Sequence, residues 1–285
     1  MKFPLLALVF LLSFSQNLSA QNDSIDVVKT KWTTTKIAPG VKLRVNWFDQ
    51  NLFNSNQNVS IVEVKSRRRN LLDLAYSRKE LIRTDEFGKK ENAIVALNGT
   101  FFDIANGGSV DFIKSDHVII NDNQLGKTGE RSGHQTSAVL INDGKLSIAK
   151  WDGNAEWEKS LTAEDVMVSG PLLIFDEQLQ HLDSNSFNIT RHPRTAIAIT
   201  KQNRVLLITV DGRNEMAAGM NLFELGKMLR WLGASEAINL DGGGSTALWI
   251  DSKSHTGIIN YPSDNKKWDH EGARKVANVI LLKRK

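Results

Sequence analysis

The chain has 285 residues, of which 41% are hydrophobic and 24% are charged, with a net charge of +4 and a pI near 9.2. This composition is typical of a folded globular protein with a substantial core and excludes a largely disordered chain. The mild positive charge suits an anionic ligand but is too small to indicate nucleic-acid binding. No cysteine is present, so the fold contains no disulfide bonds.

The first twenty residues have the pattern of a secretory signal peptide. Lys2 precedes an apolar run that ends at Leu12, and the small-residue sequence Leu-Ser-Ala follows at 18–20. The apolar run is shorter than the roughly 20 residues that a membrane-spanning helix needs. We therefore expect residues 1–20 to be a signal peptide cleaved after Ala20, no membrane span in the mature chain, and a secreted or periplasmic location in a bacterium.

Strand patterns dominate the first half of the mature chain. Residues 21–90 are predicted to be a strand-rich lead-in, within which residues 58–66 alternate apolar and polar side chains. A short apolar strand is expected within 91–103 and ends at Asn98. The glycine-rich, polar stretch at 105–133 is then predicted to be a long loop or hairpin, and such loops often carry function.

The second half combines further strands with one helix. Residues 136–151 contain an Asn-Asp-Gly turn between two alternating runs, which predicts a β-hairpin. Four more strands are expected within 165–179 and 193–212. Leucines at helical spacing predict a helix over 221–233 that ends at its final glycine. Because no repeat or linker is found, the sequence predicts a single strand-rich α+β domain with mixed or antiparallel sheets, few helices and a site in the strand-end loops.

The sequence NLDGGGSTALWI at 239–250 carries the strongest functional signal. It places three consecutive glycines between Asp241 and Ser245, with a predicted strand on either side. A nucleotide-binding loop would need a following helix or a Gly-Lys-Ser/Thr sequence, and neither is present. Glycines let backbone N–H groups approach an anion closely, although a strained turn between two strands explains them equally well.

Four further groups of polar residues stand at the ends of predicted apolar strands. A single residue of this kind is more often a surface side chain than a catalyst, but strand-end loops are where rigid scaffolds display their sites. The groups are Asn98 with Asp103; Arg191, His192, Arg194 and Thr195; Asp211 with Arg213; and Glu271, Arg274 and Asn278.

Taken in order, these motifs resemble those of the phosphodiester glycosidase family. The resemblance covers roughly residues 90–282 and predicts a phosphodiester glycosidase domain over 91–285. It is carried by NGTFFD (98–103), SGPLLIFD (169–176), HPRTAIAIT (192–200), TVDGR (209–213), GMNLFELGKMLRWLG (219–233), AINLDGGGST (237–246) and ARKVANVILL (273–282). The chain departs from the family pattern at Thr100 and Ala198, where the family usually or often has glycine. The family implies hydrolysis of the bond between a sugar's anomeric carbon and a phosphodiester, which releases free sugar from a glycan or cell-surface polymer.

This reaction suggests a role for each candidate residue. A phosphomonoester leaving group is a stable anion that needs positive charge and N–H donors, whereas the sugar side needs a carboxylate. We expect Asp211 and Asp241 to be the catalytic carboxylates, with Glu271 as a reserve. The expected substrate- and phosphate-binding residues are Asn98, Arg194, Thr195, Arg213, Gly242, Gly243, Gly244, Ser245, Thr246, Arg274 and Asn278.

Other functions stay open at this point. An arginine-lined pocket also suits a glycosidase acting on acidic or non-phosphorylated glycosides. A non-catalytic glycan-binding protein of the same fold would use exposed aromatic residues, with Trp151, Trp157, Trp249 and Trp268 as candidates. A metal-dependent phosphodiesterase is disfavoured because the six histidines are scattered. We expect a carbohydrate substrate, no nucleic acid and no required cofactor, although Asp and Asn oxygens are suitable ligands for Ca²⁺.

Overall fold

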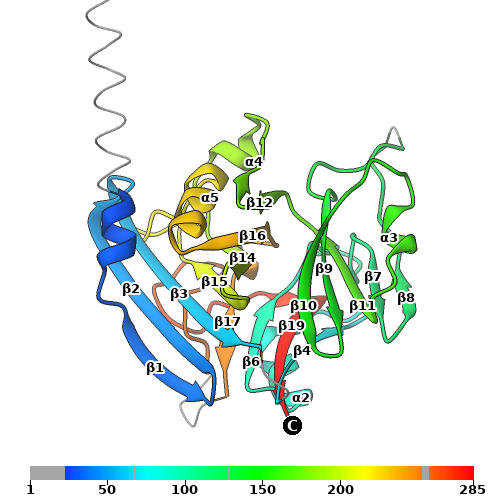
Figure 1. Cartoon of the computed structure of the whole chain (residues 1–285), viewed down its shortest axis with the longest axis horizontal. Coiled ribbons are helices and arrows are strands. Elements are labelled where there is room, and N and C mark those ends of the chain that lie inside the picture. Colours follow the sequence, from blue (N-terminus) through cyan, green and yellow to red (C-terminus); the bar gives the residue numbers. More distant parts are fainter. Residues whose placement is uncertain (1–22, 67–68, 128, 252–256) are drawn as a thin grey trace, which may run out of the picture.

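The structure is a computed structural model that describes residues 23–66, 69–127, 129–251 and 257–285. The predicted signal peptide at 1–20 lies outside these residues. The described chain forms antiparallel sheets with a few short helices (Figure 1), which confirms the strand-rich α+β prediction. Among the described residues, no helix is both long enough and apolar enough to cross a membrane.

Strands make up most of the secondary structure, and the helices between them are short. The strands are β1 (Thr33–Ala38), β2 (Val41–Leu52), β3 (Ser55–Lys65), β4 (Asn70–Tyr76), β5 (Ile82–Arg83), β6 (Val95–Asn98), β7 (Ile113–Ser115), β8 (Val118–Asn121), β9 (Ser137–Asn142), β10 (Lys145–Lys150), β11 (Asp165–Ser169), β12 (Leu172–Phe175), β13 (Gln178–Leu179), β14 (Arg194–Thr200), β15 (Arg204–Val210), β16 (Ala234–Asn239), β17 (Leu248–Ile250), β18 (Lys275–Val276) and β19 (Asn278–Arg284). The helices are α2 (Thr84–Lys90), α3 (Trp157–Ser160), α4 (Ser186–Ile189), α5 (Leu222–Trp231) and the 3₁₀ turn η1 (Gly243–Ser245), preceded by a helix at 23–29.

An eight-stranded sheet in the order β1-β2-β3-β15-β14-β16-β12-β13 is the largest element of the fold. Both faces of β14 are buried, and its side chains differ between the two faces. Ala196 and Ala198 belong to the core cluster that contains α5, where small side chains let the helix approach the sheet. Ile197 and Ile199 face the opposite way, into the core shared with the other sheets. This two-sided burial explains why β14 is apolar throughout rather than alternating.

Two smaller sheets complete the central core. They have the orders β10-β9-β11-β7-β8 and β17-β6-β19-β4, and β5 pairs separately with β18. In Figure 1 the β7–β11 sheet lies at the opposite side of the molecule from β1–β3. The predicted hairpin is confirmed as β9 and β10, joined by Asp143 and Gly144 at φ values of 50° and 68°. Positive φ at both positions is the geometry that a two-residue hairpin turn prefers.

The predicted long helix is confirmed as α5. Asn221 caps its N-terminus by accepting a hydrogen bond from Glu224 N–H at 2.9 Å, and Glu224 Oε2 accepts from Asn221 N–H at 3.0 Å. This reciprocal pair is a capping box, so Glu224 has a structural explanation. Gly233 lies beyond the last turn at φ 88°, a conformation that favours glycine.

The strand ends singled out in the sequence meet where two sheets adjoin. At the start of β14, Arg194 pairs with Val210 at the end of β15. Ala196 pairs with Asn239 at the end of β16. In the neighbouring sheet, Asn98 at the end of β6 lies opposite the start of β19. Strands from the described part of the 21–90 lead-in belong to the same sheets, since β3 pairs with β15 and β4 pairs with β19.

Candidate active site

Asn98 is the centre of a buried hydrogen-bond network that joins the strand ends of two sheets. Its Nδ2 donates to the Asp241 carbonyl at 2.7 Å. Its Oδ1 accepts from Thr195 Oγ1 at 2.8 Å and from Ala247 N–H at 3.0 Å. Thr195 Oγ1 also lies 3.3 Å from Thr246 Oγ1. Asn98, Thr195 and Thr246 have no exposed surface. Their hydrogen bonds to Asp241 O and Ala247 N–H therefore fix the path of the 241–247 loop from inside the protein.

Asp211 is equally buried and has a full set of partners. Its Oδ1 accepts from Asn260 Nδ2 and from Tyr261 N–H, each at 2.9 Å, and its Oδ2 accepts from Asn58 Nδ2 at 2.8 Å. Burial raises the pKa of Asp211 to about 6, although these hydrogen bonds favour the ionised form. Asp211 therefore anchors the segment at 260–261, and Asn260 Nδ2 also reaches the Thr246 carbonyl at 3.0 Å.

Asp241 follows β16 and is only half-buried, unlike Asp211. Its backbone is held on both sides, since its N–H donates to Gly99 O at 3.1 Å and its carbonyl accepts from Asn98. These contacts hold the backbone of Asp241, and the residue is partly exposed. Of the three predicted carboxylates, Asp241 combines partial exposure with a backbone that is anchored to the Asn98 network.

The surroundings of Asp241 raise the pKa of its carboxyl group towards neutral pH. Removal from bulk water raises its pKa to about 6, and the charge of Asp111 acts in the same direction. The Ser245 side chain, the charge of Arg274 and the Gly242 N–H oppose this rise by stabilising the carboxylate. Asp241 is therefore ionised at neutral pH but becomes protonated in mildly acidic solution, as is common for a catalytic carboxyl group.

Gly243 provides space in the glycine loop. Its φ of 61° lies in the region that favours glycine, and a Cβ there would stand 3.2 Å from both terminal nitrogens of Arg213. Its N–H is used within the protein, where it donates to Pro193 O at 2.8 Å. The expected role of this glycine was to offer its N–H to an anion, but in the structure it makes room for a guanidinium group.

Gly244 makes room for a second guanidinium group. A Cβ on this residue would lie 2.4 Å from Asp264 Oδ1 and 2.8 Å from Arg274 Nη2. Arg274 and Asp264 form an ion pair, in which Nε donates to Oδ1 at 2.9 Å. The Arg274 backbone N–H also donates to Gly244 O at 3.2 Å. The glycine loop and Arg274 are therefore packed against each other without an intervening side chain.

The substitution Gly244→Ala tests this close packing. The added methyl group must push the Arg274–Asp264 pair aside, because the nearest atoms belong to those side chains. We expect kcat/KM to fall by about 10–10²-fold, since a misplacement of about 1 Å has effects of this size, while the melting temperature changes little. Gly126→Ala is the matched control, because a Cβ there meets only Glu130 O at an ordinary 3.5 Å. Equal kcat/KM for the two variants would contradict the packing argument.

Arg213 is the exposed cation at this site. It has a φ of 61° without being glycine, and its Nη2 lies 3.4 Å from His192 Nδ1. Burial, followed by the charges of Arg194 and Arg213, lowers the pKa of His192, so its ring is neutral at pH 7. Arg213 therefore places a positive charge beside Gly243 at the rim of the loop.

Arg194 was expected to bind phosphate, but its side chain is buried and bonded to backbone carbonyls. The side chain is 2% exposed. Its Nε donates to Met220 O, and its Nη2 donates to Phe187 O and Thr190 O, each at 2.8 Å. Burial and the charge of Arg213 lower its pKa to about 10, which still leaves it protonated at neutral pH. Through these hydrogen bonds, Arg194 holds the surrounding loops together.

Asn278 and Thr100 extend the buried network towards the carboxylate of Asp111. Asn278 Oδ1 accepts from Thr100 N–H at 2.7 Å, and Thr100 Oγ1 donates to Asp111 Oδ2 at 2.6 Å. Thr100 is thus the link to Asp111. Within the described part of the chain, the buried Nδ2 of Asn278 has no hydrogen-bond partner.

Asp111 and His134 are site residues that the sequence reasoning missed. Asp111 is fully buried, and its Oδ1 lies 2.9 Å from His134 Nε2 and accepts from Gln135 Nε2 at 2.7 Å. The His134 ring packs 4.3 Å from the Phe101 ring. The only sequence signal was the glycine-rich stretch at 105–133, which contains Asp111 and ends directly before His134.

Glu271, the reserve carboxylate, is exposed in the loop before β18. Its backbone carbonyl accepts from Arg83 Nη1 at 3.1 Å. Among the described residues, no group of three or more His, Cys, Asp or Glu side chains is placed to hold a metal ion.

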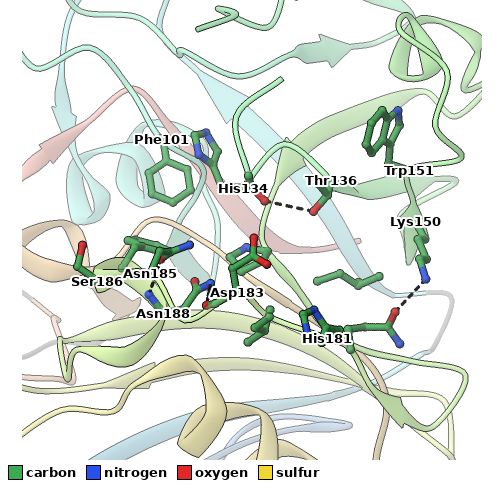
Figure 2. A pocket seen from close by; sticks show the side chains of 16 residues that line it. Phe101, His134, Thr136, Lys150, Trp151, His181, Asp183, Asn185, Ser186 and Asn188 are labelled. Carbon is green, nitrogen blue, oxygen red and sulfur yellow. Dashed lines mark hydrogen bonds between the residues drawn. The ribbon is translucent and has the colours of Figure 1, made fainter. Parts of the chain in front are cut away.

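A cavity of about 770 Å³ adjoins the Asp111–His134 pair. Phe101 and His134 form part of its wall, and Trp151, His181 and Asp183 also line it (Figure 2). The volume lies within the usual range of about 300–1,000 Å³ for ligand pockets. The candidate site is therefore the charged loop around Asp241, and the cavity is linked to it through the His134–Asp111 contact.

Comparison with known proteins identifies the family. The sequence profile of the phosphodiester glycosidase family matches residues 91–283. The chain belongs to the phosphodiester glycosidase family. Membership of this family supports glycosidase-type hydrolase activity.

Distant relatives include enzymes with an assigned activity. The chain is 24% identical over 189 residues to N-acetylglucosamine-1-phosphodiester alpha-N-acetylglucosaminidase of Homo sapiens, covering 64% of this chain and 36% of that one. It is 25% identical over 198 residues to the uncharacterized SPbeta prophage-derived protein YomE of Bacillus subtilis, covering 62% of this chain and 29% of that one. The chain thus spans about a third of the length of these relatives.

A solved structure shows the same fold. The catalytic domain of the zebrafish N-acetylglucosamine-1-phosphodiester alpha-N-acetylglucosaminidase superposes with a TM-score of 0.67 at 21% identity. The match covers 87% of this chain and 85% of that one. The phosphodiester glycosidase fold thus extends over nearly all of the chain, including strands from the 21–90 lead-in.

Proposed function

We propose that this protein hydrolyses the bond between the anomeric carbon of a sugar and a phosphodiester oxygen. Three observations support the proposal: the family, the activity named for the human relative, and the charged loop around Asp241. The signal-peptide pattern at 1–20 supports placing the reaction outside the cytoplasm. The geometry of the loop is the strongest of the three observations, because one half-buried carboxylate and two guanidinium groups lie around it.

In the proposed reaction, Asp241 acts on the sugar side. The oxygen of water bonds to the anomeric carbon, the carbon–oxygen bond to phosphate breaks, and its electron pair stays on the phosphate oxygen. The attacked carbon develops positive charge, which a nearby carboxylate stabilises. The proton lost by water passes to solvent. With a pKa of about 6, Asp241 supplies the required negative charge at neutral pH.

The guanidinium groups of Arg213 and Arg274 act on the phosphate side. The departing phosphomonoester carries an additional negative charge, and guanidinium groups bind phosphate oxygens with paired, charge-assisted hydrogen bonds. Arg213 is exposed beside Gly243, and Arg274 is packed against Gly244. Both groups flank the loop that starts at Asp241. This arrangement suits a stable anionic leaving group that needs little general-acid assistance.

Hydrolysis in oxygen-18-labelled water tests which bond is broken. A nitrophenyl diester of a sugar 1-phosphate should yield nitrophenyl phosphate whose phosphate oxygens contain no label. Attack at carbon leaves the phosphorus–oxygen bonds intact, whereas attack at phosphorus introduces one labelled oxygen. Mass spectrometry of the nitrophenyl phosphate reads this directly and avoids the slow oxygen exchange of free sugars. Labelled nitrophenyl phosphate, or nitrophenol released together with labelled sugar 1-phosphate, would instead establish a phosphodiesterase.

Absence of cleavage across a panel of sugar 1-phosphate diesters would contradict the proposal. An ordinary nitrophenyl glycoside of the same sugar belongs in each assay as the comparison substrate. Faster cleavage of the glycoside than of the diester would identify a glycosidase for non-phosphorylated substrates. Binding without cleavage of either would identify a glycan-binding protein of this fold.

A further inference from the structure

Five basic side chains gather on one face of the eight-stranded sheet. The pairing of neighbouring strands places them there. Lys36 of β1 lies opposite Lys42 of β2, and Lys65 of β3 lies opposite Arg204 of β15. Arg44 follows Lys42 by two positions on β2, so its side chain lies on the same face. These five residues are called the cationic face below.

Glu63 joins the two pairs of basic residues. It is the cross-strand partner of Lys42, and it precedes Lys65 by two positions on β3, so all three lie on one face. Its carboxylate accepts a hydrogen bond from Arg204 Nη1 and lies 3.7 Å from Arg44 Nη1. Two guanidinium groups therefore share one buried carboxylate at the centre of the cationic face.

This single carboxylate leaves the cationic face with excess positive charge. Among the described residues, no ion pair with an acid is found for Lys36, Lys42 or Lys65. Burial lowers the pKa of Arg44, Glu63 raises it, and the charge of Arg204 lowers it further. Like charges directly opposite each other on adjacent strands are destabilising. An anionic ligand beside the two like-charged pairs would relieve this repulsion.

The cationic face lies at the opposite end of the sheet from the candidate active site. Arg204 begins β15, whereas Asp211 directly follows its last residue, and a strand of this length spans roughly 20 Å. The lysines of β1 and β2 are exposed, and the other three residues are partly exposed. In Figure 1, β1, β2 and β3 form one side of the molecule. A ligand bound here would therefore occupy a surface separate from the Asp241 loop.

The spacing of the charges suits a chain of acidic groups better than one small anion. Neighbouring strands are about 5 Å apart, so four strands spread the cations over roughly 15 Å. Successive acidic sugars in a polysaccharide carry carboxylate, phosphate or sulfate groups at a comparable spacing. Guanidinium and ammonium groups bind such oxygens through charge-assisted hydrogen bonds.

Other occupants fit this surface less well. A second copy would bring the same positive charge and be repelled. Stable attachment to a membrane takes a second signal besides charge, and the exposed large hydrophobic side chains of the described residues lie outside β1, β3 and β15. Single-stranded nucleic acid stacks its bases on aromatic rings, but the Trp32 ring already carries Arg44, with Cζ 4.8 Å from its centroid.

We propose that the cationic face binds an acidic polysaccharide and holds the protein on that polymer. The acid groups of the polymer lie beside the Lys36–Lys42 and Lys65–Arg204 pairs, while the Asp241 loop at the other end of the sheet stays accessible. This binding site goes beyond the proposed hydrolase function and does not depend on it.

Calorimetric titration at low ionic strength tests the proposal, with polygalacturonate, alginate and dextran sulfate as probes and neutral dextran as the uncharged comparison. We expect at least one acidic polymer to bind the wild-type protein and to bind more weakly as salt screens the charges. The combined variant Lys36→Gln, Lys42→Gln and Lys65→Gln should bind that polymer at least about tenfold more weakly. Its melting temperature should not fall, because the substitutions relieve repulsion.

A matched control removes three exposed lysines that lie outside the eight-stranded sheet: Lys79, Lys90 and Lys275. Its affinity should stay within about twofold of the wild-type value, since net charge alone does not define the site. Both combined variants should cleave a nitrophenyl sugar 1-phosphate diester at the wild-type rate. If the wild-type protein cleaves no diester, the binding comparison still stands.

Three outcomes would overturn the proposal. The first is that none of the acidic polymers binds the wild-type protein. The second is an equal loss of affinity in the control variant, which would show attraction by net charge without a defined site. The third is that duplex DNA or phosphatidylglycerol vesicles bind the wild-type protein more tightly than every polysaccharide and lose affinity in the Lys36, Lys42 and Lys65 variant. That result would assign the cationic face to nucleic acid or to a membrane surface.

Discussion

Replacing Asp241 by Asn is expected to lower turnover by roughly 10²–10³-fold, the usual cost of removing one preorganised group that stabilises charge in the transition state. Asn keeps the shape of the side chain but removes the negative charge that stabilises the attacked carbon. The backbone contacts of Asp241 with Asn98 and Gly99 do not involve the side chain, so the loop should keep its path. Substrate binding should therefore change little, which steady-state and single-turnover kinetics would show.

The pH profile provides the control for this substitution. The charged form of Asp241 is the active one, so kcat/KM should rise as pH increases through about 6 and level off above it. Asp211 has a pKa raised to the same region, so the profile alone does not assign the group. The residual activity of Asp241→Asn should lack this rise. Full turnover in Asp241→Asn, or an unchanged rise, would remove Asp241 from the catalytic role.

Elements specified by neighbouring residues were predictable from the sequence. The β9–β10 hairpin depends on the Asn-Asp-Gly turn, whose last two residues adopt positive φ. Helix α5 depends on leucine spacing and on the capping box between Asn221 and Glu224. In both cases the determining residues lie within a few positions of each other, so local propensity and tertiary packing agree.

Contacts between distant residues were not predictable in the same way. Arg194 stands in a polar strand-end group, but its partners are carbonyls that no side-chain motif reveals. One of them, Met220 O, is 26 positions away. Asp111 and His134 are 23 residues apart, and their contact depends on how the glycine-rich stretch folds back. A sequence pattern shows that a residue is charged and near a strand end. It does not show whether the side chain turns inward or towards solvent.

The glycine loop illustrates the same limit. The sequence indicated both a turn and an anion cradle, and the structure shows a 3₁₀ turn at Gly243–Ser245. The Gly243 N–H donates to Pro193 O. The absence of Cβ atoms at Gly243 and Gly244 nevertheless brings positive charge to the loop, because the guanidinium groups of Arg213 and Arg274 occupy the space beside these glycines. A compact glycine turn can thus contribute to an anion site through the arginines that it admits.

The substitution Arg194→Ala should mainly reduce stability. It removes the donors to three backbone carbonyls in a site that is 2% exposed. A buried polar group left without a partner costs about 1–3 kcal/mol, so we expect the free energy of unfolding to fall by on the order of 3 kcal/mol or more. Arg194→Lys should restore little, because a compact ammonium group does not reproduce the planar fork of guanidinium. Urea denaturation measures this loss, and activity is compared per folded molecule.

Arg213→Ala is the matched comparison for Arg194→Ala and should show the opposite pattern. Arg213 is exposed, so its loss should alter the free energy of unfolding by no more than about 0.5 kcal/mol. Because its guanidinium lies beside Gly243 at the rim of the loop, KM for a sugar 1-phosphate diester should rise and kcat/KM should fall. Wild-type stability with a raised KM in Arg194→Ala would instead place that guanidinium on the phosphate. The pair of variants thus separates an arginine that supports the loops from one that meets the substrate, although both lie beside the ends of apolar strands: Arg194 at the start of β14 and Arg213 just after β15.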